Sequence, residues 1–194
     1  MLQLFVPLAR QALTEPREAA TTLLSMGVPK AAYWPAFLTL VVLSVILNEV
    51  VRMLTAVPVT GPQIAPLVMA GLAALISAVS VWAIWKVGRA MGGTGQFDEA
   101  LLLTVFLQAI LFAGQLVEVG LMLILPPLAG LFSVALIVLA FWLNVNFVAA
   151  LHGFTSLWRA LGALFLATLG VALVLIFLMT LTGFTPGMGG AGNV

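Results

Sequence analysis

The chain has 194 residues, of which 63% are hydrophobic and only 7% are charged, and its mean hydropathy is +1.26. Soluble globular domains carry about a quarter charged residues, so this composition excludes a soluble globular protein. The net charge of +1 excludes a general electrostatic attraction to nucleic acid. The lack of cysteine excludes disulfides and thiolate metal sites, and a single histidine excludes a multi-histidine metal site within one chain.

Residues 1–33 are expected to form a cytoplasmic or interfacial segment. The first thirteen residues are mostly apolar and include Arg10, and they lack the basic start and cleavage site of a signal peptide. In the next stretch, TEPREAATTLLSMG, Thr14 can cap a helix, Pro16 stands in its first turn, and Gly27 can end it. Its apolar and charged residues separate onto two faces, which predicts a short amphipathic helix on the membrane surface. A loosely ordered leader is the alternative.

Five apolar stretches follow, each about 20 to 25 residues long, which at 1.5 Å per residue matches a hydrocarbon core of about 30 Å. Backbone groups in lipid must pair internally, so these stretches are helices. The predicted spans are residues 34–54, 66–86, 100–125, 128–151 and 160–181. The expected fold is therefore all-α, a bundle of five transmembrane helices over residues 34–182, with a flexible Gly-rich tail at residues 183–194.

The positive charges orient these spans. Cytoplasmic loops carry an excess of lysine and arginine. With the N-terminus in the cytoplasm, only Arg52 lies outside, and six basic residues lie inside: Arg10, Arg17, Lys30, Lys86, Arg89 and Arg159. The sequence thus predicts a cytoplasmic N-terminus and a C-terminus on the opposite side.

The third span, ALLLTVFLQAILFAGQLVEVGLMLIL, carries four polar residues at intervals of four, seven and three: Thr104, Gln108, Gln115 and Glu118. This spacing places them close to one stripe of a helix. Polar groups facing lipid are costly, so the stripe is expected to face inward from the central helix of the bundle.

Depth along the spans predicts two polar layers. The outer layer joins Gln115 and Glu118 to three residues of the first span: Asn48, Glu49 and Arg52. The inner layer joins Thr104 and Gln108 to Asn144 of the fourth span. Glu49 and Arg52 are three residues apart and could instead pair within their own helix.

Two functional interpretations follow from these layers. Intramembrane carboxylates can belong to a proton or ion path, which would make the chain a small transporter or channel using Glu118, Glu49 and Arg52. The same residues can instead hold the helices together, because the middle of the spans offers mostly Leu, Val, Ala and Ile rather than a continuous polar chain.

Two weaker motifs lie in the loops. GGTG at residues 92–95 lacks the GK[ST] of a phosphate-binding loop, and a turn before a helix starting at Phe97 explains it better, so nucleotide binding is not expected. His152 and Ser156 are four residues apart, but no GxSxG setting surrounds the serine. The sequence therefore indicates no enzyme and no cofactor. An intramembrane enzyme is the least favoured interpretation.

Three segments resemble the bacterial branch of the Yip (Ypt-interacting protein) membrane-domain family: LTEPREAATTLL, GGTGQFDEALLL and HGFTSLWRALGALFLA. The five-span layout is also similar to that family. The eukaryotic branch carries an acidic–Leu–Tyr–Gly–Pro motif before the first span, whereas this chain has AAYWPA there, so Rab-GTPase binding is not carried over.

The resemblance implies a non-enzymatic protein of the bacterial inner membrane, with a periplasmic C-terminus. Its expected role is that of a scaffold or accessory factor that organises the bilayer or binds other membrane proteins or a second copy of itself. The candidate partner-facing residues lie in two cytoplasmic loops: Gly92, Gly93, Gly95, Phe97, His152, Trp158 and Arg159.

Overall fold

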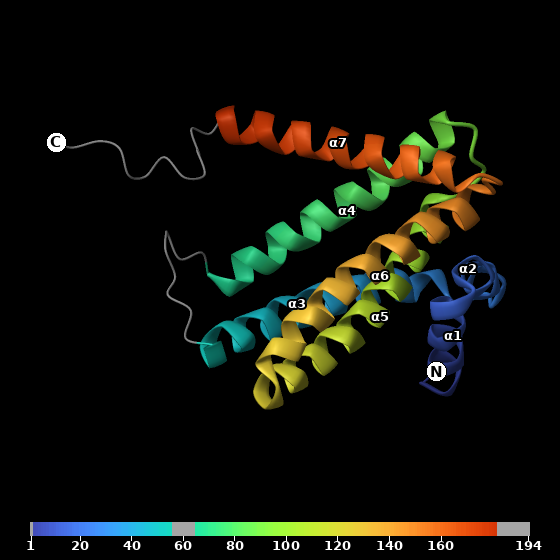
Figure 1. The fold of residues 1–194 in the computed structure, drawn as a ribbon. Helices are drawn as coiled ribbons and strands as arrows, with labels where there is room; N and C mark the ends of the chain where they lie inside the picture. The colour runs from blue at the N-terminus through green and yellow to red at the C-terminus, as the bar shows by residue number, and fades with distance from the viewer. Residues whose placement is uncertain (1, 56–64, 182–194) are drawn as a thin grey trace.

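The computed structural model describes residues 2–55 and 65–181. The predicted Gly-rich tail and the Pro- and Gly-containing turn after the first span lie outside the described residues. Within the described part, the chain forms helices and their connections and contains no strand (Figure 1). The elements are α1 (Leu2–Thr14), α2 (Pro16–Ser25), the short 3-10 helix η1 (Lys30–Ala32), α3 (Tyr33–Thr55), α4 (Pro66–Ala90), α5 (Phe97–Ile124), α6 (Pro126–His152) and α7 (Leu157–Leu181).

Five of the described helices, α3 to α7, are long and apolar enough to cross a membrane, which confirms the predicted spans. Their ends follow local chemistry. α4 and α6 begin at Pro66 and Pro126, where proline fits the first helical turn. α5 begins at Phe97, where the Glu99 carboxylate accepts a hydrogen bond of 2.7 Å from the Gln96 backbone N–H. α6 ends at Gly153, which adopts a left-handed conformation with φ of +66°.

α5 is the central helix, as predicted. Of its most apolar 18 residues, 39% are buried, against 11–17% for the other four spans. It packs against α3, α4 and α6, which surround it. An aromatic ladder crosses the centre, in which Phe5 of α1 meets Phe106 edge-on at 5.9 Å and Phe106 stacks on Phe147 of α6 at 5.8 Å. These contacts bury large apolar surfaces and fix α1 against the bundle.

The N-terminal region differs from the prediction at its first turn. Thr14 does not cap a helix, because it is the last residue of α1 and its hydroxyl donates to the carbonyl of Gln11. Glu15 precedes α2 instead. α2 and α1 lie at the end of the bundle that also carries the α4–α5 and α6–α7 connections (Figure 1). Ala19 and Ala20 of α2 are fully buried, so this short helix packs closely against α1 and α6.

α7 packs on α4 and α6 through small side chains. Ala160, Ala163 and Ala167 are the buried residues of α7, and the first two form a cluster with Val145 and Ala149 of α6. Small residues let helix backbones approach closely in membranes. These small residues therefore let α7 lie close to its neighbours.

Candidate functional site

Three of the five residues predicted for the outer layer lie together. Asn48 of α3 and Gln115 and Glu118 of α5 line one cavity of about 100 Å³, whose remaining walls are apolar. The carbonyl oxygen of the Gln115 side chain is shielded from solvent and has no hydrogen-bond partner among the described residues. A volume of this size holds about three water molecules. The cavity can therefore hydrate a carboxylate inside the bundle.

The other two outer residues, Glu49 and Arg52, do not join this cavity. Arg52 Nε donates to Glu49 Oε2 at 2.8 Å, and a second guanidinium nitrogen donates to the other carboxylate oxygen. Glu49 and Arg52 thus form an ion pair within α3, which is the alternative that their three-residue spacing left open. Arg52 therefore pairs with Glu49, one helix turn away, and not with Glu118 on the neighbouring helix.

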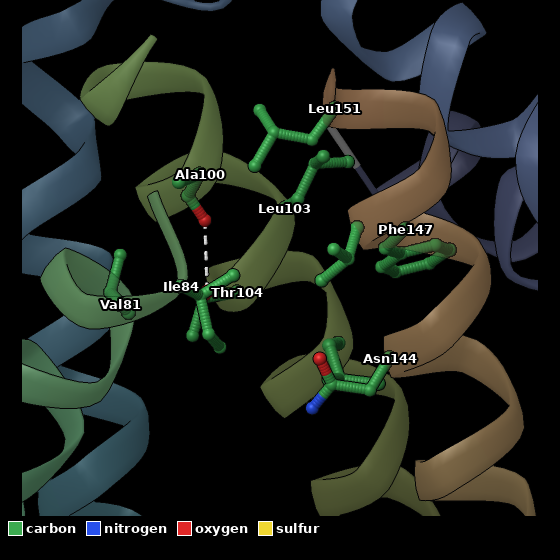
Figure 2. Close-up of a pocket in the computed structure, with 10 residues that line it drawn as sticks. Val81, Ile84, Ala100, Leu103, Thr104, Asn144, Phe147 and Leu151 are labelled. Carbon is green, nitrogen blue, oxygen red and sulfur yellow. Dashed lines mark hydrogen bonds between the residues drawn. The ribbon is translucent and has the colours of Figure 1, made fainter. Parts of the chain in front are cut away.

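The inner layer comes together in part. Thr104 of α5 and Asn144 of α6 line a small pocket of about 20 Å³ (Figure 2). The Thr104 hydroxyl donates to the carbonyl of Ala100 at 2.8 Å, so its hydrogen bond is made within its own helix. Gln108 does not line this pocket. The pocket has room for about one water molecule, which is too little for a wet path through the bundle.

His152 is packed inside the protein at the end of α6. Its side chain is 2% exposed and stacks on Phe154 at a ring distance of 5.4 Å. Glycines of the α4 end and of the following loop lie directly against the ring, since a methyl group at Gly88 would overlap its Nε2 side and one at Gly93 its Nδ1 side. The backbone carbonyl of Ile84 interacts with the ring without the geometry of a full hydrogen bond. This histidine is therefore a packing residue between two connections and is not presented to a partner.

The GGTG loop, residues 92–95, also packs closely against the end of α6. A methyl group at Gly95 would lie 2.6 Å from the carbonyl oxygen of Leu151, so the loop backbone runs directly against α6. The Trp85 indole N–H donates to the Gly95 carbonyl at 3.1 Å, and the Thr94 N–H donates to the His152 carbonyl at 3.3 Å. Gly92 takes a φ of +91°, which favours glycine. The glycines thus serve a close backbone approach between α4 and α6.

The remaining loop residues differ in exposure. Phe97 is half-buried between the rings of Trp34 and Trp85, with ring distances of 6.3 and 5.8 Å. Trp158 is 80% exposed, and Arg159 beside it is also exposed. Of the seven loop residues singled out from the sequence, these two offer large side chains to the surroundings.

Sequence reasoning missed two groups at this end of the bundle. Gly88 was not singled out, although a glycine near the end of an apolar helix is a signal of close packing. The ion pair between Lys30 Nζ and Asp98 Oδ2, at 2.5 Å, was also missed, because the partners are 68 residues apart. It joins η1, directly before α3, to the first turn of α5.

The five spanning helices and their polar cavities define a multi-pass, all-helical membrane protein. A family model described as the Yip1 domain matches residues 10–179. The chain therefore belongs to the Yip1 domain family, as its loop segments indicated. No curated protein and no solved structure matches the chain.

Proposed function

We propose that the chain is a non-enzymatic scaffold or accessory factor that binds other membrane proteins at the end of the bundle carrying the α4–α5 and α6–α7 connections. The observation that carries this proposal is the exposure of Trp158, at 80%, next to the exposed Arg159. Tryptophan and arginine are the residues that most often dominate the binding energy of protein interfaces. An indole at this level can also anchor the protein among lipid headgroups, which the experiment below separates.

The side chains that could take part in a reaction support a structural role rather than catalysis. His152 is enclosed by glycine backbones and Phe154, and the Ser156 hydroxyl accepts a hydrogen bond from the Trp158 N–H at 3.3 Å. Asn146 is 3% exposed and donates to the Trp142 carbonyl within α6. These groups contribute to packing and helix geometry, so the proposed function needs no reaction.

Location and orientation are part of the proposal. α2 buries Ala19 and Ala20 against α1 and α6 and leaves Glu18 and Thr21 exposed, which suits a helix at the surface of the membrane. The basic residues of the loops favour this end as the cytoplasmic one. AAYWPA, which spans the end of η1 and the first turn of α3, favours the bacterial branch of the family, and hence the inner membrane with a periplasmic C-terminus.

A small transporter is the second candidate, favoured by the cavity that Asn48, Gln115 and Glu118 share. It requires a path from this cavity to the opposite end of the bundle. The pocket at Thr104 and Asn144 holds about 20 Å³, and Leu107 and Ile110 are buried between the two levels. This constriction is the reason that the scaffold function is preferred.

The test is co-purification from native membranes in a mild detergent, with the retained proteins identified by mass spectrometry. The wild-type chain is compared with the double variant Trp158→Ala/Arg159→Ala, and with Trp82→Ala, which removes an indole of 52% exposure from α4. We expect a partner in near-equal amount with the wild type and Trp82→Ala, and its loss in the double variant. Equal recovery in all three, or no partner at all, contradicts the proposal.

A further inference from the structure

An apolar groove of about 440 Å³ lies beneath α1, against the membrane-facing surfaces of α5 and α6. α1 supplies its roof, and its walls include Ala113 of α5 and Ala135 of α6. This volume falls within the range of small-molecule sites, which is about 300 to 1,000 Å³. The groove is thus an open, concave apolar surface formed by three helices, which suits an acyl chain.

One charged residue borders this groove. Arg10 lines it and is exposed, and neither of the two ion pairs among the described residues involves it. A guanidinium matches the oxygens of a phosphate with paired hydrogen bonds. The groove thus combines an apolar trough with a phosphate-binding group at its rim.

The arginine and the groove lie at depths that suit the headgroup and the acyl chain of a lipid. α5 has 28 residues, so it is about 42 Å long and extends about 6 Å beyond a 30 Å hydrocarbon core at each end. Phe106, which contacts Phe5 of α1, lies nine residues into α5, or about 8 Å below the edge of that core. By the same count, the α5 wall of the groove, from Ile110 to Val117, lies about 14 to 24 Å below that edge, so the groove reaches the middle of the bilayer, where acyl chains end. Interfacial helices lie about 5 to 10 Å deep, from where an arginine side chain extends up to the headgroups.

We propose that this groove binds one anionic phospholipid, with an acyl chain beneath α1 and the phosphate against Arg10. A second groove, on the other side of α1, is lined by Leu23 and Val28 and has no charged residue, so it offers no such match. The proposed site goes beyond the scaffold function and does not depend on it.

The test is native mass spectrometry of the detergent-purified chain after incubation with equal amounts of phosphatidylglycerol and phosphatidylcholine. We expect one retained lipid per chain, with about a fivefold preference for phosphatidylglycerol, because one arginine near an anionic surface contributes about that factor. Arg10→Gln should abolish the preference, and Arg10→Lys should keep most of it. Arg89→Gln, which removes an exposed cation outside the groove, should behave as the wild type.

A second set of variants tests the trough. Ala113→Phe fills the groove and should abolish lipid retention, whereas Val174→Phe, at a position of 54% exposure on α7, should not. If Ala113→Phe does not fold, Ala135→Leu on the opposite wall replaces it.

Three results would overturn the proposal. The first is retention that neither Arg10→Gln nor the filled groove changes. The second is displacement of the lipid by glycerophosphoglycerol, which has the headgroup without acyl chains, at the concentration at which phosphatidylglycerol itself competes. The third is a dimer mass without lipid, which would make a second copy of the chain the occupant.

Discussion

The backbone of Gly88 lies directly against the imidazole ring of His152, and a methyl group at position 88 would overlap that ring. Gly93 bounds the ring on another side, so it has no room to move away. We expect Gly88→Ala to lower the free energy of unfolding by about 1–3 kcal/mol, the usual cost of overpacking a core. This loss should exceed the gain of about 1 kcal/mol that alanine brings to a helix interior. Thermal unfolding in detergent measures it.

Gly170 provides the matched control, because it also lies inside a helix and a methyl group there would meet nothing within 4 Å. Gly170→Ala should leave the unfolding temperature unchanged or raise it slightly. Adding His152→Ala to Gly88→Ala should remove most of the penalty from the glycine change, as a double-mutant cycle would report. Equal unfolding temperatures for Gly88→Ala and Gly170→Ala would show that the contact is looser than described.

Trp85 ties the loop to α4 through its indole N–H, which donates to the Gly95 carbonyl at 3.1 Å. Trp85→Phe keeps an aromatic ring but leaves the buried carbonyl of Gly95 without this donor. The expected cost is about 1 kcal/mol, measured by denaturation in detergent. Trp82→Phe, at an indole of 52% exposure on the same helix, should cost little. A larger loss at position 82 than at position 85 would refute this assignment.

Glu118 shares a cavity with Asn48 and Gln115 but has no ion pair among the described residues, since Arg52 pairs with Glu49. Under the proposed function, liposomes with the wild type and with Glu118→Gln should show the same proton and ion flux as protein-free liposomes. Both proteins should also unfold at similar temperatures, because no paired charge is lost. A wild-type flux that Glu118→Gln abolishes, with the fold intact, would favour the transporter.

The chain has no cysteine, so single cysteines report its orientation without background labelling. Thr94 and Arg159 are exposed at one end of the bundle, and Leu125 is exposed at the other, where α5 gives way to α6. In intact inverted vesicles of the inner membrane, an impermeant maleimide should label Thr94→Cys and Arg159→Cys, and Leu125→Cys only after permeabilisation. Gly93 is a poor reporter position, because a side chain there meets His152. The reverse labelling pattern would invert the proposed topology.

The membrane spans could be predicted because a stretch of about 20 apolar residues is typical of a transmembrane helix. Their ends could not, since helices continue past the hydrocarbon. α4 runs four residues beyond Lys86. The start of α5 is an exception, because the GGTG turn before it and the carboxylates of its first turn predicted a helix from Phe97. α1 was not predicted as a helix, because its position depends on the contact of Phe5 with Phe106, which no local pattern encodes.

The contacts of the polar residues, too, could be predicted only in part. Asn48, Gln115 and Glu118 share a cavity because helix period and depth bring them to one level. The competition between the partners Glu49 and Glu118 for Arg52 depends on side-chain reach, which the sequence leaves open. The position of His152 depends on contacts with residues of other segments, among them Gly88 and Gly93, so the sequence alone placed it in a partner-facing loop rather than in the interior.

The packing of α7 on α4 and α6 has a consequence for biosynthesis. The cluster that holds Val145 and Ala149 is completed by Ala160 and Ala163, which belong to the last of the five described spans to leave the ribosome. Until then, this face of α6 and the neighbouring side of α4 stay open to lipid or to an insertion factor. A chain truncated before Leu157 would keep the other four spans but leave this face of α6 without the alanines that cover it.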